Sequence, residues 1–293
     1  MRLDYLALGN PTLDVQAGGS FVLGGSVVYS ALQAARLGLS AEILGRGNLA
    51  QLGPYWQPYA GEAGLHLQPA GSATMFRNVS VGDSREQWLE SWAGKIGDLS
   101  HMPDSDILHI APVAQEISLE RVATECQSRF VLLTPQGLVR RWDRIGARIE
   151  LVRRGFPAAV SSVVDVVVVS ETEAPYVSEL LAAVPRRGGL GVVTRGRRGC
   201  EVLTREGSAE YTADPVRTLV DPTGAGDCFA ATLTTEMFRG RPVPEAIRLA
   251  TAAASLCVSG QGPATIGGRQ EIMSERGSSP GVVGSPGRPR PGG

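Results

Sequence analysis

A glycine-rich turn that runs directly into a helical pattern constrains this chain more than any other stretch. The turn reads Asp221-Pro222-Thr223-Gly224-Ala225-Gly226-Asp227, and the helical pattern after it stops at Gly240. Gly224 and Gly226 can adopt positive φ, so several backbone N–H groups can point into one concavity. The helix start adds unpaired N–H groups and a partial positive charge. The stretch therefore predicts an anion site suited to phosphate.

Asp227 stands at the start of that helix, beside the predicted anion site. A carboxylate there can accept the proton of a substrate hydroxyl as the hydroxyl attacks phosphorus. A simpler interpretation makes Asp227 only the helix N-cap, and this interpretation would be preferred for an isolated Gly-x-Gly-Asp. The complete run of seven residues is much more specific, and it favours the catalytic interpretation.

Asp-x-Thr-Gly-Ala-Gly-Asp resembles the C-terminal signature of the ribokinase-like (PfkB) family of carbohydrate and nucleoside kinases. By this resemblance Asp227 is the catalytic base, and the amides of Gly224, Ala225 and Gly226 form the anion hole. The resemblance covers roughly residues 3–268. It implies an α/β fold of three layers, in which a mostly parallel sheet carries helices on both faces and a small β lid.

The N-terminal part resembles the same family through Gly-Asn-x-x-x-Asp followed by Gly-Gly. In the family this Asp binds substrate hydroxyls and the Gly-Gly pair lies under the substrate, which implies these roles for Asp14, Gly24 and Gly25. A turn Asp and a packing Gly-Gly are the alternative interpretation. The next residues read as a helix that is capped by Ser26 and ends at Gly38.

Two further groups of residues match cation positions of the family. The strand at 163–169 ends at Ser170-Glu171-Thr172-Glu173, where the family carries Asn-x-x-Glu with a Glu that organises the water shell of magnesium. Glu173 matches and Ser170 replaces the Asn, while a capping box between the two residues fits equally well. Asp221 and Thr223 match positions that help to bind potassium next to the anion hole.

The lid is expected from residues 12–23 and 65–87, which alternate and are rich in turns. In the family such a flap closes over the substrate and often supplies a dimer surface, so a homodimer through the lid is expected. Asn78 and Arg85 are candidate substrate contacts. Each is equally well explained as the polar face of an exposed strand.

Other loops supply the remaining candidates. Gln136 follows a buried strand and is a candidate substrate contact, because ligands bind beyond the carboxyl ends of parallel strands. Thr194, Gly196 and Gly199 resemble the turn of the family on the nucleotide side, a pattern that is weak by itself. His109 lies inside an apolar strand and is interpreted as a core histidine. The arginine-rich segment 138–156 is interpreted as a solvated excursion.

Composition limits the class of protein. The 293 residues carry a formal net charge of −1, so there is no basic excess for nucleic acid or a membrane surface. The N-terminus reads as a strand, and no apolar run could span a bilayer, so a cytoplasmic protein is expected. A kinase domain is expected over residues 1–270, with a disordered Gly/Pro/Ser-rich tail over 271–293.

The resemblance implies an ATP-dependent kinase that phosphorylates a hydroxyl of a small polyol: a sugar, a cyclitol such as myo-inositol, or a nucleoside. ATP and Mg²⁺ are the implied donor and cofactor, with K⁺ as an added activator. The alternative is a weak or inactive ligand-binding protein on the same fold, which the Ser170 substitution favours and the intact Asp227 opposes. A dinucleotide-dependent oxidoreductase is disfavoured because no Gly-x-Gly-x-x-Gly follows the first strand.

Overall fold

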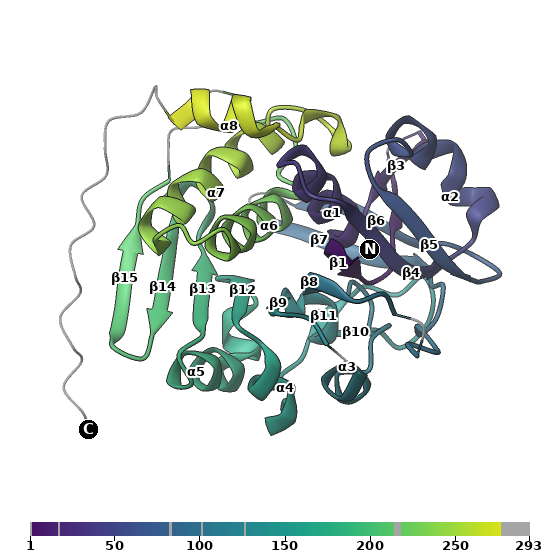
Figure 1. The fold of residues 1–293 in the computed structure, drawn as a ribbon. Helices are drawn as coiled ribbons and strands as arrows, with labels where there is room; N and C mark the ends of the chain where they lie inside the picture. Colours follow the sequence, from purple (N-terminus) through teal and green to yellow (C-terminus); the bar gives the residue numbers. More distant parts are fainter. Residues whose placement is uncertain are drawn as a thin grey trace.

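The computed structural model describes residues 2–16, 18–81, 84–100, 102–125, 127–213 and 218–276, without the side chains at 80, 81, 84, 85 and 276. A nine-stranded sheet with helices on both faces forms its centre (Figure 1). All neighbours are parallel except where β14 and β15 add an antiparallel edge, so the expected mostly parallel sheet is confirmed. The strands, in spatial order, are β15 (Gly207–Tyr211), β14 (Cys200–Thr204), β13 (Leu190–Thr194), β12 (Val166–Ser170), β9 (Phe130–Leu133), β8 (Ser105–Ile110), β1 (Leu3–Leu8), β4 (Ala41–Gly47) and β5 (Gly64–Pro69).

Helices cover both faces of this sheet, and this explains why the residues of strand β1 are nearly all apolar. Tyr5 and Ala7 pack with the helices of one face, and Leu6 and Leu8 pack with those of the other. A strand that is buried on both sides reads as a continuous apolar run. One face carries α1 (Ser26–Arg36), α6 (Ala225–Phe238), α7 (Val243–Cys257) and α8 (Arg269–Arg276); the other carries α3 (Leu119–Glu125), α4 (Ala158–Val163) and α5 (Ser178–Arg186).

Shorter elements complete the described chain. Helix α2 (Leu49–Trp56) follows β4 and contacts lid strand β3. None of the described helices is long and apolar enough to cross a bilayer. The 3₁₀ turns are η1 (Gln57–Tyr59), η2 (Pro135–Leu138), η3 (Ala174–Tyr176), η4 (Gly196–Arg198) and η5 (Gly262–Thr265).

The lid is a separate four-stranded sheet in the order β3-β2-β6-β7, formed by β2 (Thr12–Val15), β3 (Phe21–Gly24), β6 (Thr74–Val81) and β7 (Ser84–Ser91). The expected lid boundary of 65–87 is wrong at its start. Residues 64–69 form β5, which pairs in parallel with β4 at the edge of the central sheet. The lid is also mixed, because β2 and β6 are parallel. An alternating pattern identifies a half-buried strand and leaves its partner undetermined.

Residues 140–151, called the strap here, lie against the outer edge of the lid. The strap begins and ends in the two-stranded ribbon of β10 (Arg140–Arg141) and β11 (Glu150–Leu151). Its middle pairs with β7, since the Leu89 and Ile149 amides donate to the Ala147 and Gln87 carbonyls at 3.1 and 2.8 Å, and the Gly146 amide donates to Leu89 at 2.7 Å. The segment interpreted as a solvated excursion is therefore a structural partner of the lid.

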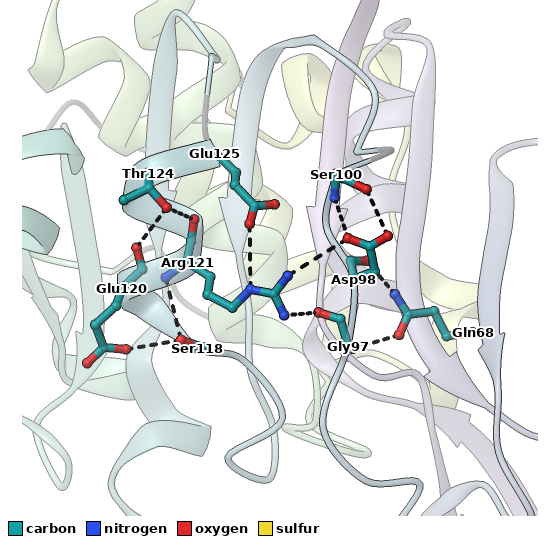
Figure 2. Close-up of polar contacts among 9 residues, drawn as sticks. All are labelled: Gln68, Gly97, Asp98, Ser100, Ser118, Glu120, Arg121, Thr124 and Glu125. Atoms are coloured by element: carbon teal, nitrogen blue, oxygen red, sulfur yellow. Dashed lines mark hydrogen bonds and ion pairs between the residues drawn. The ribbon is translucent and has the colours of Figure 1, made fainter.

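The chain that leaves the lid is fixed by the polar network drawn in Figure 2. Arg121 on α3 donates to the Gly97 carbonyl at 2.5 Å and forms ion pairs with Asp98 and Glu125 at 3.8 and 3.5 Å. From the other side Gln68 donates to the Asp98 carbonyl and accepts from the Gly97 amide, both at 2.7 Å. The loop after β7 is thus held between the end of β5 and α3.

Helix α8 extends the ordered fold beyond the expected domain end at residue 270. Ile272 is 1% exposed and packs with Leu37, Leu249 and Ala253 against the outer side of α7. Burying an isoleucine side chain contributes about 1.5–3 kcal/mol, which fixes this short helix on the body. Residues 277–293 of the expected tail lie outside the described residues.

Candidate active site

A cavity of about 650 Å³ opens at the carboxyl ends of the parallel strands, between the lid, the strap and the start of α6. Ser170 and Thr194 end β12 and β13, Thr134 follows β9, and all three line it. This is the usual ligand position in open α/β sheets. The volume falls in the range of about 300–1,000 Å³ that small-molecule sites occupy.

The glycine turn and the start of α6 form one wall of the cavity. Gly224 is the N-cap residue with φ 83°, as expected, and the helix starts at Ala225. The expected positive φ at Gly226 is wrong, because this residue already lies in the first helical turn. Gly224 and Gly226 line the cavity, whereas the Ala225 amide donates to the Pro222 carbonyl at 3.4 Å. First-turn amides have no partner within their own helix, and those of Gly226 and Asp227 are therefore of the kind that bind anions.

Asp227 lines the same cavity from the first turn of α6. Burial raises its pKa from 3.8 to about 7; a hydrogen bond from Ser26 and the charge of Arg140 act against this, while the charge of Glu173 adds to it. A carboxyl group with a pKa near neutrality is suited to taking up a proton during a reaction. The position and the pKa both fit the role of general base expected from the sequence.

Asp14 lies on the lid side of the cavity, on β2. It is 9% exposed, and it accepts hydrogen bonds from Thr12 and Asn78 at 3.5 and 3.4 Å. Gly24 and Gly25 lie next to it at the end of β3 and the start of α1. A Cβ at Gly24 would crowd Thr12 Oγ1 at 3.0 Å and the Asp14 carboxylate at 3.3 Å. Gly25 has φ 95°, and a Cβ there would come within 2.9 Å of the Asn10 carbonyl oxygen, so glycine is required at position 25.

The candidate lid contacts have different outcomes. Asn78 bridges Asp14 and Gln87, since its oxygen accepts from Gln87 at 2.9 Å, so it orients the Asp14 carboxylate. The side chain of Arg85 lies outside the described residues. Glu86 and Gln87, which the sequence reasoning did not single out, line the cavity in its place.

Two strap arginines in the cavity were missed by the sequence reasoning. Arg140 donates to the Val113 carbonyl at 2.7 Å and to Gln136 at 3.1 Å, and its guanidinium lies 5.3 Å from the centre of the Phe76 ring. Arg148 pairs with Glu86 of β7 at 2.7 Å. Their presence depends on pairing between the strap and the lid, for which the interleaved charges of the sequence gave no sign. Gln136 lines the cavity as expected.

Ser170 and Glu173 form the reciprocal bonds of a capping box. The Ser170 amide and hydroxyl donate to Glu173 Oε2 at 3.0 and 2.8 Å, and the Glu173 amide donates back to the Ser170 hydroxyl at 3.3 Å. Both residues line the cavity. Among the described residues Glu173 Oε1 has no hydrogen-bond partner, so the carboxylate is held by one oxygen and presents the other. These bonds have the pattern of a capping box but cap no helix, because Ser170 ends β12 and the 3₁₀ turn η3 that follows has Glu173 as its N-cap. The arrangement leaves room for the cation role.

The described part of the chain holds no cluster of three or more His, Cys, Asp or Glu side chains suited to a metal. Four acids, Asp14, Glu86, Glu173 and Asp227, line the cavity together with two arginines, Arg140 and Arg148. This acidic excess would repel a polyphosphate unless a cation came with it, as Mg²⁺ does when it binds through phosphates and one or two carboxylates. Asp221 Oδ1 accepts from the Thr223 amide at 2.9 Å.

On the expected nucleotide side, Thr194 lines the cavity and its hydroxyl donates to the Val169 carbonyl at 3.2 Å. Gly196 begins the 3₁₀ turn η4 and Gly199 follows it, with φ 54° and 88°, and neither lines the cavity. Gly199 is required by packing, because a Cβ there would come within 1.9 Å of the Tyr211 carbonyl oxygen.

Beneath the site, His109 is a core residue as predicted. It is fully buried, and its two ring nitrogens contact the Tyr5 and Thr134 hydroxyls at 2.9 Å each. Burial lowers its pKa to about 3, so the ring is neutral at physiological pH. This uncharged chain fixes Thr134, a residue of the cavity wall.

Comparisons with known proteins agree with the motif. Residues 153–267 match the family model described as pfkB family carbohydrate kinase. The chain is 41% identical over 87 residues to the bifunctional protein HldE of Methylobacillus flagellatus, covering 29% of this chain and 18% of that protein. It is 32% identical over 165 residues to an inositol 3-kinase of Zea mays, covering 54% of this chain and 42% of the relative. The matched stretches thus span less than half of these relatives.

Solved structures with the same fold match nearly the whole chain. The sulfate complex of a pyrophosphate-dependent kinase in the ribokinase family aligns with a TM-score of 0.76 at 18% identity, covering 92% of this chain and 99% of the other. Arabidopsis thaliana ribokinase with ribose and ATP aligns with a TM-score of 0.68 at 19% identity, covering 95% and 100%. The resemblance to the ribokinase-like (PfkB) family is therefore confirmed, in sequence over residues 153–267 and in fold over most of the chain.

Proposed function

We propose that this chain is an ATP-dependent kinase that phosphorylates a hydroxyl group of a small polyol: a sugar, a cyclitol such as myo-inositol, or a nucleoside. One observation carries the proposal. Asp227, with its pKa near 7, and the Gly224 turn at the start of α6 line the same cavity as the lid residue Asp14. A base, an anion site and a hydroxyl-binding carboxylate are the parts that phosphoryl transfer to an alcohol needs.

In this proposal Asp14 and the Gly24-Gly25 turn hold the acceptor, with Asn78 orienting Asp14. Asp227 takes the proton of the attacking hydroxyl, and the backbone at Gly224 and Gly226 receives the transferring phosphoryl group. Thr194 lies on the donor side, and the turn with Gly196 and Gly199 borders it. Electrostatic stabilisation of the phosphoryl group is usually the largest contribution in such sites.

Mg²⁺ bound to the donor would neutralise the phosphates that the acidic cavity repels. Glu173 Oε1 is suited to hold its water shell, and Asp221 with Thr223 is the proposed potassium site. A homodimer through the lid is part of the same proposal. Pyrophosphate is kept as an alternative donor in the test, because one structure with this fold belongs to a pyrophosphate-dependent kinase complexed with myo-inositol.

A panel assay with the purified full chain tests the proposal. The donors are ATP and pyrophosphate with Mg²⁺, the acceptors are myo-inositol, ribose and inosine, and product formation is followed directly by phosphorus NMR. We expect transfer from ATP to one acceptor class, and transfer slowed by about 10²- to 10⁴-fold in the Asp227→Asn variant. Acceptor binding in calorimetry without transfer from either donor would instead support the ligand-binding alternative.

A further inference from the structure

A carboxylate lies buried behind the cavity wall, where the chain turns from β8 towards α3. Glu116 is 0% exposed and is not among the residues that line the cavity. Its Oε1 accepts from the Asn10 and Val113 amides at 3.0 and 2.8 Å, and its Oε2 accepts from the Ala114 amide at 2.7 Å. Burial raises the pKa of Glu116, and the bonds from these amides act against this because they favour the ionised form.

The bond to Ala114 fixes the peptide unit between residues 113 and 114. In a trans peptide the C=O and N–H groups lie in one plane and point in opposite directions. The N–H group of this unit is directed to Glu116, and its C=O group, which belongs to Val113, accepts from Arg140 Nη1 at 2.7 Å. Glu116 and Arg140 therefore hold the two ends of one peptide unit, and each polarises it in the direction that strengthens the bond of the other.

Other atoms of Arg140 are held as well. Gln115 Nε2 donates to the Arg140 carbonyl, and Gln115 has φ 57°, a strained conformation that persists only where its surroundings fix it. Arg140 Nη2 donates to Gln136 Oε1 at 3.1 Å, and Gln136 Nε2 donates to the Ser26 hydroxyl. Ser26 was expected to cap α1 but is the first residue of that helix, because Gly25 is the N-cap. The guanidinium is thus fixed through two of its nitrogens.

The fixed guanidinium lies in the half of the cavity that belongs to the lid. Arg140 lines the cavity, and its guanidinium is 5.3 Å from the centre of the Phe76 ring. Phe76 on β6 is paired in register with Asp14 on β2, the carboxylate proposed to hold the acceptor. A guanidinium in this half can donate hydrogen bonds to the hydroxyl oxygens of a polyol.

We propose that Glu116 is a positioning residue, which acts through the 113–114 peptide to hold the Arg140 guanidinium in place for the acceptor. The inference rests on the proposed function for its kinetic consequence. A Glu116 that only tied down its own loop would affect stability and leave Arg140 unchanged, and the experiments are chosen to separate these two roles.

Glu116→Gln removes the bond in question and keeps the other two. A glutamine side chain has one accepting oxygen and one NH₂ group. The oxygen can retain the bonds from the Asn10 and Val113 amides, and the NH₂ group then meets the Ala114 N–H, donor against donor. Asn10→Asp is the matched control, because it removes the 3.1 Å bond to the Gly94 carbonyl at an equally buried residue and leaves the 113–114 peptide unchanged.

The first measurement needs no turnover. Nitrogen NMR of the arginine side chains in the full chain without ligands, with Arg140→Lys assigning the signals, should show separate Nη1 and Nη2 resonances for Arg140, since each nitrogen is bonded to a different acceptor. We expect these resonances to broaden or merge in Glu116→Gln and to stay separate in Asn10→Asp. Identical Arg140 signals in the wild type and Glu116→Gln would overturn the proposal.

A measurement from the other end of the peptide covers the case in which Glu116→Gln does not fold. In Arg140→Ala the amide proton of Ala114 should shift upfield, because the guanidinium no longer polarises the shared peptide. The amide proton of Asn10, which reaches Glu116 from a different peptide unit, should keep its shift. An Ala114 shift equal to that of the wild type would show that the two ends are not coupled and would contradict positioning.

The kinetic test is a double-mutant cycle. Arg140→Ala should raise the acceptor KM about 10- to 100-fold, and Glu116→Gln about 3- to 10-fold, with the donor KM unchanged in both. The double variant should match Arg140→Ala alone, whereas the effects of Asn10→Asp and Arg140→Ala should multiply. A further rise in the double variant would make Glu116 a structural residue independent of Arg140. Absence of transfer by the wild type would reject the proposed function and leave the NMR results to decide the positioning.

Discussion

The ring of Tyr29 fills the space that a side chain at position 224 would need. A Cβ on Gly224 would lie 2.1 Å from Cδ1 of Tyr29, and the residue has φ 83°. We expect Gly224→Ala to lower stability by at least 1–3 kcal/mol, roughly the cost of one strained backbone position, and to abolish transfer. Thermal melts and initial rates check this. A melting temperature equal to the wild type would show that the turn does not need glycine at 224.

Gly226 provides the matched comparison two residues later. No atom lies within 4 Å of a Cβ built there, and the residue is helical and lines the cavity. Gly226→Ala should keep or raise stability, because Ala is favoured over Gly in a helix by about 1 kcal/mol. Its methyl group would project toward the phosphoryl position, so we expect slower transfer and a higher donor KM. Full activity in this variant would argue against close approach of the donor to Gly226.

Asp227→Asn should reduce turnover by about 10²- to 10⁴-fold, the usual contribution of a general base. Donor binding should persist, because the anion site is built from backbone groups. Rates and calorimetric donor affinity measured on the same preparation check both parts. Retention of more than half the wild-type rate would refute the assignment of the base.

The pH dependence of stability gives an independent check on Asp227. Its pKa in the folded protein is about 7, against 3.8 ordinarily, so the folded state holds the proton more tightly. The stability from this group is complete below about pH 4 and is lost as pH rises through 7. Relative to the wild type, the free energy of unfolding of Asp227→Asn should therefore rise by up to about 4 kcal/mol between pH 4 and 8. If the difference in the free energy of unfolding between the two proteins did not change with pH over that range, the raised pKa would be contradicted.

Glu173 is predicted to act on magnesium. Gln at this position can still accept from the Ser170 amide, so Glu173→Gln removes the charge and keeps the capping bond. We expect the rate to saturate at several-fold higher free Mg²⁺, with little change in melting temperature. Ser170→Ala is the reverse control: it removes the hydroxyl that bonds to Glu173, should cost about 0.5–1.5 kcal/mol of stability, and should leave the magnesium curve in place. Identical magnesium curves for Glu173→Gln and the wild type would exclude the cation role.

Local patterns predicted the parts of this site that depend on neighbours in the chain. The Gly224 turn and α6 follow from glycines next to a helical repeat, and the bonds between Ser170 and Glu173 join residues three positions apart. The predictions that were wrong or missing concern contacts between distant parts of the chain. The strand at 64–69 has the alternation of a lid strand, and only its pairing with β4 assigns it to the central sheet. Arg140 and Arg148 reach the cavity because the strap pairs with the lid, more than fifty residues earlier in the chain.

The bonds of the strap to β7 also determine how this protein can meet other molecules. An open strand edge is a template on which another chain can add, which leads to aggregation or to exchange of strands between copies. Here the Leu89 amide and carbonyl and the Gln87 carbonyl are already bonded to residues 146–149 of the same chain. A strand from another chain would have to break those hydrogen bonds before it could pair with β7. The outer border of the lid at β7 is therefore protected from templated growth.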